Sequence, residues 1–524
     1  MPHRSLRPLF AVGLVIVLLG YVGCSGSLDV ASDSQAKVGK PNESTFTVAN
    51  SLEKPAHVDT PFADWPTPSA ALVISGEQFG YLEPCGCTEG QHGGLLRRAD
   101  MLEKLRDEKQ WPLALVDLGS LIKAPSLARG GPEQIKLKFR AALQALSTLK
   151  YNALALSPED LKLGIDETVG QFLNMPDGPL RVVAANVIAN GLDSKIATST
   201  RTKAGTVSIG ITAVIDPETV KALKDPSDLL VVKPIEETLP GVLKDLETDT
   251  QTQVLLVQGP RELAKDLASK YPGFDIVVAT SEFPDPADTA ETANDGKTMI
   301  VSVGHKGKFV GVVGIFELAE PRYRYQRVAL DTRYKGPAAA MKTVIEGEFR
   351  DSLKAQGIVE NFLRHDFVNA ASNAKYVGAE SCKTCHPNTY AKWASTKHAL
   401  AYASLEKDPK PNVIYDAECI SCHTTGFEYT SGWKSAELTP YLKGNQCENC
   451  HGPASRHITD PNNLEVRGFL HLTAERADKN RLCIGCHDED NSPHFKFETH
   501  WPQVVHTGLD KPKTKPASSV GKGN

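Results

Sequence analysis

The strongest constraint on this chain is a five-residue pattern, Cys-x-x-Cys-His, which occurs four times near its C-terminal end. The four copies are Cys382–His386, Cys419–His423, Cys447–His451 and Cys483–His487. From the Cys and His content of the chain, chance predicts on the order of 0.01 copies. Ten of the 15 His and eight of the 11 Cys lie after residue 380, so the chemistry of the chain is concentrated there.

The spacing within each copy indicates covalent attachment of a haem. Two thiols three residues apart lie on one side of a helical turn, where both can bond to the vinyl groups of one haem. The next residue can then bind the iron as its proximal ligand. The predicted attachment residues are Cys382, Cys385, Cys419, Cys422, Cys447, Cys450, Cys483 and Cys486. The predicted proximal ligands are His386, His423, His451 and His487, for a total of four covalently bound haem c groups.

Two other uses of paired cysteines explain the pattern less well. Structural zinc sites use Cys-x-x-Cys, but they need no His directly after every pair. A disulfide framework is possible in an oxidising compartment, and it also has no use for four adjacent imidazoles. Regular structure should be sparse here, because Gly, Pro, Asn and Thr interrupt every potential helix. We therefore expect the haems to supply much of the core.

The distal ligands decide whether an iron is closed by a second side chain or open to small molecules. Six His remain in this region after the proximal four. They are His398, His457, His471, His494, His500 and His506. Spacing alone leaves the choice among them open.

The sequence around the motifs resembles the cytochrome c554 family. The similar segments lie at 376–380, 393–399, 422–426, 447–457, 492–495 and 501–506, so that the resemblance covers roughly residues 376 to 507. It implies four closely stacked haems, of which three have two His ligands and one has an open iron.

Carried onto this chain, the resemblance implies His398, His457 and His506 as distal ligands, and it leaves open which of them serves which haem. We expect His494 and His500 to face solvent or haem propionates. The apolar neighbours of His471 favour a packed position in the core.

The region before the motifs has the pattern of an α/β domain. Short apolar runs alternate with amphipathic stretches from about residue 68 to residue 330, and continuous apolar strands suit a sheet that is covered on both faces. The predicted strands include 71–74, 113–116, 152–156, 181–185, 207–215, 254–257 and 275–278, and the predicted helices include 95–109, 133–149, 235–246 and 262–270. Residues 299–303 and 309–316 are predicted to form a closing antiparallel pair.

The order of these elements resembles the metallophosphatase fold of exported 5'-nucleotidases. The similar segments are 81–87, 93–99, 185–186 and 304–311. The predicted fold class is therefore α/β: a metallophosphatase-like layered sheet domain, followed by a mainly α multihaem cytochrome c domain of low regularity.

The residues that hold the two metal ions of that family are replaced in this chain. Two-metal hydrolysis needs Asp, His and Asn ligands. The chain has Glu77-Gln-Phe79 in place of Asp-x-His, Ser120 in place of Asp, and 157–160 (Ser-Pro-Glu-Asp) in place of Gly-Asn-His-Glu. Later His positions fall on or near Gln258, Ser281 and Phe283. We expect this domain to serve docking or structure and to lack hydrolase activity.

Cys85 and Cys87 are an unusual pair within that domain. A local disulfide or two small buried residues is the favoured interpretation in an oxidising compartment. The alternative is a metal or redox pair beside His92.

The N-terminus reads as an export signal. Basic residues precede an apolar stretch from Leu9 to Val22, which is short for a membrane span. Gly23-Cys24 at its end resembles a bacterial lipoprotein cleavage site, which would leave Cys24 as the acylated N-terminus. An ordinary signal peptide and an uncleaved anchor are the alternatives, and each places the folded part outside the cytoplasm. We expect a periplasmic protein that is anchored through Cys24.

The predicted organisation has six parts: a signal peptide (1–24), a flexible linker (25–66), a degenerate metallophosphatase-like domain (67–335), a helical connector (336–375), a tetrahaem domain (376–508) and a disordered tail (509–524). The predicted function is electron transfer, with other cytochromes or a haem oxidoreductase as redox partners. The net charge of −5 argues against nucleic acid as a partner. An oxidoreductase that acts on a small nitrogen or sulfur compound at the open haem is the first alternative, and a nucleotide or sugar-phosphate hydrolase is the second. Whether the protein is an enzyme stays open, no catalytic residue is assigned, and an electron carrier is favoured.

Overall fold

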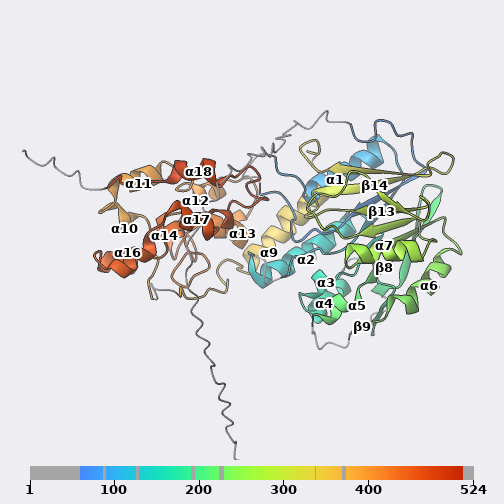
Figure 1. Ribbon diagram of the computed structural model, residues 1–524, viewed down its shortest axis with the longest axis horizontal. Coiled ribbons are helices and arrows are strands. Elements are labelled where there is room, and N and C mark those ends of the chain that lie inside the picture. Colours follow the sequence, from blue (N-terminus) through green and yellow to red (C-terminus); the bar gives the residue numbers. More distant parts are fainter. Residues whose placement is uncertain are drawn as a thin grey trace, which may run out of the picture. The chain divides into compact units, whose positions relative to one another are not determined.

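The computed structural model describes residues 60–85, 90–124, 129–175, 177–190, 195–223, 229–336, 338–368 and 373–510. Residues Thr60–Asn524 belong to one compact unit, in which an α/β region precedes a mainly helical region (Figure 1). Cys24 and Cys87 lie outside the described residues, so the anchor and the local disulfide stay predictions. Within the described ranges, no helix has the length and apolar character that a membrane span requires.

The first of two sheets in the α/β region is built mainly from parallel strands. Its strands are β1 (Ala70–Ser75), β2 (Leu113–Asp117), β3 (Ala153–Ala155), β4 (Arg181–Val183), β6 (Ile196–Ala197), β14 (Phe309–Ile315) and β15 (Tyr323–Ala329). They are arranged in the order β15-β14-β1-β2-β3-β4-β6. The strands from β1 to β6 in this order are parallel, whereas β14 is antiparallel to both β1 and β15.

The second sheet has antiparallel strands at both edges. Its strands are β7 (Ser199–Ala204), β8 (Val207–Ile215), β10 (Thr252–Gln258), β11 (Ile276–Ala279), β12 (Glu291–Ala293) and β13 (Thr298–Ser302), in the order β12-β13-β11-β10-β8-β7. The four central strands are parallel. A separate antiparallel pair is formed by β5 (Val187–Ala189) and β9 (Leu230–Val232).

Helices cover the outer face of each sheet. They are α1 (Leu95–Glu103), α2 (Gly131–Thr148), α3 (Pro158–Leu161), α4 (Ile165–Leu173), α5 (Pro217–Lys221), α6 (Ile235–Leu246) and α7 (Arg261–Lys270). Alternate residues of β1 show the layering: Leu72 and Ile74 share a core with β8 and β10, whereas Ala71 and Val73 share a core with α1 and α2. A third core joins α6 and α7 to the second sheet. The predicted α/β class is confirmed, and each sheet is covered by helices on one face and by the other sheet on its second face.

The predicted closing pair of strands is wrong. β13 pairs with β11 and β12 in the second sheet, whereas β14 pairs with β1 and β15 in the first. Both strands are almost fully buried apolar runs, and such runs carry no signal of which partner each will choose. The turn around Lys306 and Gly307 therefore connects two sheets rather than two neighbours in one sheet.

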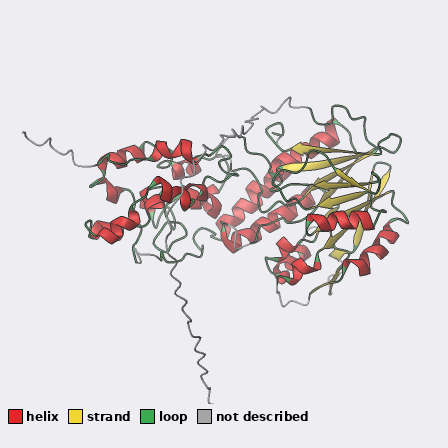
Figure 2. Cartoon of the chain, viewed as in Figure 1, coloured by secondary structure: helices red, strands yellow, loops and turns green. Residues whose placement is uncertain are grey.

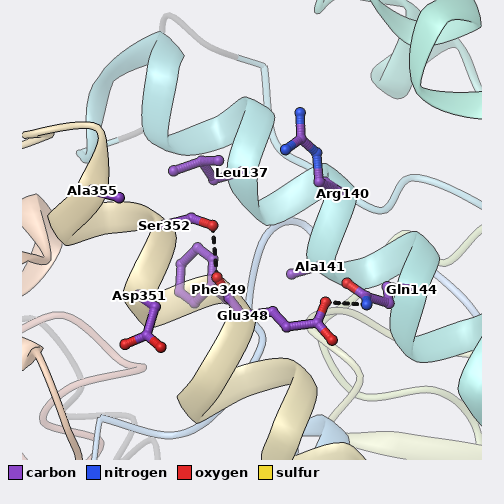
Figure 3. Close-up of a pocket in the computed structure, with 9 residues that line it drawn as sticks. All are labelled: Leu137, Arg140, Ala141, Gln144, Glu348, Phe349, Asp351, Ser352 and Ala355. Atoms are coloured by element: carbon purple, nitrogen blue, oxygen red, sulfur yellow. Dashed lines mark hydrogen bonds between the residues drawn. The ribbon is translucent and has the colours of Figure 1, made fainter. Parts of the chain in front are cut away.

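The segment between the two regions contains helices. It consists of α8 (Ala339–Lys342), a π-helical turn over Thr343–Phe349, and α9 (Arg350–Ala355). It packs along α2, with which it lines a shallow groove of about 420 Å³ (Figure 3). Gln144 of α2 donates a hydrogen bond to Glu348 across this groove. The connector thus helps to fix the position of α2.

Short helices and loops make up the region that carries the motifs, while the strands gather in the α/β region (Figure 2). The helices are α10 (Glu380–Lys383), α11 (Pro387–Ala394), α12 (Ala401–Glu406), α13 (Ala417–His423), α14 (Cys447–His451), α15 (Ser455–Thr459), α16 (Leu464–Leu470), α17 (Ala474–Lys479) and α18 (Phe497–Val504). This confirms the predicted mainly α character and low regularity. The exact domain boundaries stay a prediction.

Asp160 gives the α/β region a testable dependence on pH. Its carboxylate is buried and accepts a hydrogen bond from the backbone N–H of Ile122 at 3.1 Å. Burial raises the pKa of Asp160 to about 8, against about 3.9 in an unfolded chain. The folded protein therefore keeps a proton that the unfolded chain releases, and this group lowers the free energy of unfolding as the pH rises from about 4 to about 8.

We expect Asp160→Asn to remove that dependence. Thermal melts followed by circular dichroism at pH 5, 6.5 and 8 should show the variant gaining stability relative to wild type as the pH rises. Parallel melting profiles for the two proteins would contradict the role given to this carboxyl group.

Candidate functional site

Each of the four motifs forms a helical turn that brings its two thiols to one side. The second motif is the end of α13 and the third is α14. In the first and fourth motifs, the N–H of the His donates to the carbonyl of the first Cys, at 2.9 Å for His386 and 2.8 Å for His487. In these motifs, a local backbone hydrogen bond between the His and the first Cys therefore produces the predicted attachment geometry.

Three proximal His each face one of the predicted distal His. The ring centroids are 6.4 Å apart for His386 and His457, and 6.0 Å apart for His487 and His398. Those of His451 and His506 are 5.6 Å apart. A metal ion held by two imidazole nitrogens at about 2 Å each would place the ring centroids roughly 6 Å apart. All three spacings fit one iron between the members of each pair.

His423 differs from the other proximal His. No other imidazole in the described part of the chain faces it in this way. Its Nδ1 lies 2.6 Å from the carbonyl oxygen of Ala401, which orients the ring. The second motif is therefore the one whose iron would have a single imidazole ligand.

The surroundings of the imidazoles suit metal ligands. The Nδ1 atoms of His451 and His506 lie at hydrogen-bond distance from backbone carbonyls, 2.7 Å from Leu470 and 3.0 Å from Val504. Such contacts fix a ring and leave Nε2 for the metal. Nδ1 of His457 is buried without a hydrogen-bond partner among the described residues, which would fit a ligand that binds through Nδ1 instead.

Burial also favours the neutral form of five imidazoles of this region. It lowers the pKa of His398, His423, His451, His457 and His487. The neutral imidazole is the form that binds metals. The residues thus fit haem iron, while the individual ligand assignments stay a prediction.

Interactions between attachment thiols connect the four motifs. The thiols of the first and third motifs meet at Cys382 and Cys447, and those of the second and fourth motifs meet at Cys422 and Cys486. Cys486 also interacts with Cys450 of the third motif. The order of the sites in space is therefore first, third, fourth and second.

The other His of this region lie elsewhere. His494 and His500 are exposed, as expected. The prediction of a buried His471 is wrong: it is exposed, because it caps the end of α16 with extended backbone instead of pointing into the apolar cluster of its neighbours.

Most of the residues at the expected phosphatase metal positions make contacts within the protein. The ring of Phe79 packs on His305, with centroids 5.3 Å apart, and the hydroxyls of Ser120 and Ser157 lie 2.9 Å apart. Glu77 accepts the N–H of Ser281 at 2.8 Å. Two other residues at expected metal positions also make no metal site. Gln258 donates a hydrogen bond to the carbonyl of Leu118, and Phe283 is exposed. Throughout the described ranges, no group of three or more His, Cys, Asp or Glu is placed to hold a metal ion.

Cys85 is close to the motif region. Its sulfur accepts a hydrogen bond from Gln91 at 3.1 Å, and Gln91 also donates to the carbonyl of Asp490 at 2.7 Å. The predicted pair with Cys87 lies outside the described residues in part, so neither the disulfide nor a metal role is tested.

Three residues of the α/β region that carry no sequence signal contact the motif region. Arg129 donates to the carbonyl of Gly485 at 2.8 Å and to the carboxylate of Asp488 at 3.0 Å. Gln134 and Lys138 of α2 contact the segment just before the second motif. Their residue types are ordinary for a helix surface, and only the fold places them beside the motifs.

Comparison with known proteins agrees with the motif geometry. Residues 381–452 match the family model of cytochrome c554 and c-prime, and residues 439–492 match a doubled CXXCH motif. Cytochrome c-554 of Nitrosomonas europaea is 33% identical over 95 residues, which are 16% of this chain and 40% of that cytochrome. The chain thus spans well under half of this relative. The matches show a c-type cytochrome region that binds haem c covalently.

Solved structures similar to the chain are phosphoesterases and related hydrolases. They include the 5'-nucleotidase precursor of Thermus thermophilus, with 17% identity, a TM-score of 0.45, and coverage of 62% of this chain and 67% of that chain. The calcineurin-like phosphoesterase YfkN of Bacillus subtilis has 17% identity, a TM-score of 0.43, and coverage of 55% and 99% respectively. These likenesses concern the fold alone. Both resemblances predicted from the sequence are found.

Glu448 joins the first and third motifs, and its loss should weaken the region. Its carboxylate is 2% exposed and accepts the N–H groups of Val377, Gly378 and Ala454 at 2.8–3.1 Å. Glu448→Ala would leave these donors without their acceptor, at a cost of about 3 kcal/mol or more. Denaturant unfolding of the haem-loaded protein should show this loss. Glu380→Ala, at a glutamate whose side chain is 72% exposed, is the control and should change stability little. Equal stabilities of the two variants would contradict the role of Glu448.

Proposed function

We propose that this chain is an exported tetrahaem c-type cytochrome that transfers electrons. The observation that carries the proposal is the set of four attachment motifs. In three of them the motif His faces a second imidazole, and in the fourth no imidazole of the described residues does so. When bound, each haem c supplies an iron that accepts and releases one electron.

The four proposed haem sites are of two kinds, which differ in the number of imidazole ligands. We assign His457 to the first motif, His506 to the third and His398 to the fourth, because each of these rings faces the corresponding proximal His. Two imidazoles on one metal exclude a small molecule from both axial positions, which suits electron transfer. His423 would hold its metal from one side, and no second imidazole among the described residues faces it.

We further propose that the α/β region has no hydrolase activity and serves structure or docking. Ser120, Phe79 and Gln258 cannot replace the carboxylate and imidazole ligands that two-metal hydrolysis requires. Their side chains are also engaged in contacts within the protein. Purified protein supplied with Mn²⁺ or Zn²⁺ should therefore not hydrolyse nucleotides or sugar phosphates.

A second candidate function is an oxidoreductase that binds a small nitrogen or sulfur compound at the second motif. The single imidazole ligand there, His423, is the observation that favours it. Turnover of such a compound by the protein with a chemical electron donor or acceptor would separate it from a pure carrier.

The ligand assignment can be tested one haem at a time. In the electron paramagnetic resonance spectrum, the wild-type protein should show three low-spin haems and one high-spin haem that binds NO. His398→Ala, His457→Ala and His506→Ala should each convert one further haem to high spin, since each removes one axial ligand. His471→Ala is the matched control and should leave the spectrum unchanged. Four low-spin haems in the wild type would contradict the assignment of an open position at His423.

Export and anchoring form a separate proposal that rests on the N-terminal sequence. We propose acylation of Cys24, which would hold the folded part at the periplasmic face of a membrane, where other cytochromes or a haem oxidoreductase are its redox partners. Cys24→Ser should move the haem-containing protein from the membrane fraction to the soluble periplasmic fraction. A wild-type protein that is already soluble after cell fractionation would argue for an ordinary signal peptide.

A further inference from the structure

Helix α2 of the α/β region contacts the beginning of α13, the helix that carries the second motif. Nε2 of Gln134 donates to Oδ1 of Asp416 at 2.8 Å, and its Oε1 accepts the N–H of Ala417 at 3.0 Å. Nζ of Lys138 lies 2.6 Å from Oε2 of Glu418. Asp416 is the N-cap of α13 and accepts the N–H of Glu418 at 2.9 Å. One helix of the α/β region therefore fixes the first turn of the helix that presents His423.

Most of this contact is shielded from solvent, while the side chain of Glu418 is 33% exposed. Gln134 has no exposed surface, Lys138 is 7% exposed and Asp416 is 6% exposed. The ammonium group of Lys138 also donates to the carbonyl of Gly80 at 2.9 Å, so it is held from two sides. Charges in such a position interact more strongly than charges in water, and the loss of one partner leaves the other uncompensated.

The charges concerned lie next to the attachment site. Glu418 is the residue directly before Cys419, and Asp416 lies slightly earlier in the same turn. Both carboxylates act electrostatically on the sulfur of Cys419. Arg350 and Lys410 act on the same sulfur with the opposite sign, and these two cations contact Glu83. Lys138 is thus the cation that compensates the carboxylate nearest to the second motif.

Ferric haem carries one more positive charge than ferrous haem, so a nearby anion favours the oxidised form and a nearby cation favours the reduced form. We propose that helix α2 sets the reduction potential of the haem at Cys419 and Cys422, with Lys138 compensating the carboxylates that precede Cys419. This inference rests on the proposed tetrahaem function. Lys138 acts through Glu418 and is a positioning residue, not a ligand.

The experiment compares reduction potentials in the full-length, haem-loaded protein. A redox titration followed through the high-spin resonance signal reports the second haem, and the low-spin signals report the other three. Lys138→Met should lower the reduction equilibrium constant of the high-spin haem about tenfold, which is about 59 mV for one electron. The low-spin potentials should shift less.

Three further variants separate charge from packing. Lys138→Arg keeps the cation and should leave the potential near that of wild type. Lys138→Met combined with Glu418→Gln removes both charges and should restore most of the potential that the single variant loses. Glu418→Gln alone should raise the potential, and it tests the inference even if Lys138→Met fails to fold.

Lys136 offers a matched control on the same helix. It pairs with Glu133 at 2.9 Å and with Glu167 at 4.0 Å, both within the α/β region. Lys136→Met removes the same charge from α2 and should leave the potential of the high-spin haem unchanged.

The outcomes distinguish this inference from the function on which it rests. If the wild type has four haems and one of them is high-spin, but its potential is the same in Lys138→Met and Glu418→Gln, the role of α2 is overturned and the proposed function stands. An equal shift of all four potentials, or an equal effect of Lys136→Met, would also overturn it. A wild type without a high-spin haem would instead contradict the proposed ligand assignment.

Discussion

Pairs of facing imidazoles join segments of the C-terminal region that are far apart in the sequence, as with His398 before α12 and His487 after α17. Apolar packing is uneven in this region. Helices α12 and α13 contribute Tyr402, Leu405, Ala417 and Ile420 to a hydrophobic core, whereas α16 buries Val466, α17 buries Ala477, and α18 buries no residue. A metal held between two such rings would supply a cross-link where apolar packing is sparse. The loops around the motifs could then be irregular and still occupy defined positions.

The α/β region and the motif region share a hydrophobic core cluster and several polar contacts. Ile135 of α2 lies in the same cluster as Val413 and Ile420, which lie next to and within α13. Lys306 and Lys308 pair with Asp490 just after the fourth motif, and Arg129 pairs with Asp488. Gln134 and Lys138 contact the segment just before the second motif. The α/β region therefore contacts both the second and the fourth motif, whose thiols also interact with each other.

The strands of the α/β region and the loops that follow them are under different constraints. The strands are specified by apolar residues on both faces, and the core also contains the buried pair of Arg98 and Asp117, whose charged atoms lie 3.6 Å apart. Ser120 and Ser157 lie in loops that follow the strands, where their hydroxyls are 2.9 Å apart. The packing of the strands thus does not require metal ligands in these loops.

The sequence by itself determined the local features of this protein. Cys-x-x-Cys-His fixes the attachment turn because its bonds lie within five residues, and continuous apolar runs indicate the strands of a covered sheet. The sequence did not reveal the partners of β13 and β14, because two buried apolar strands look alike whichever sheet they join. The tertiary structure alone decided which of the other His faces each motif His, that no imidazole of the described residues faces His423, and that Lys138 lies beside Glu418. An imidazole or an ammonium group carries no local mark of its partner, because those contacts are made across the fold and depend on where distant segments are held.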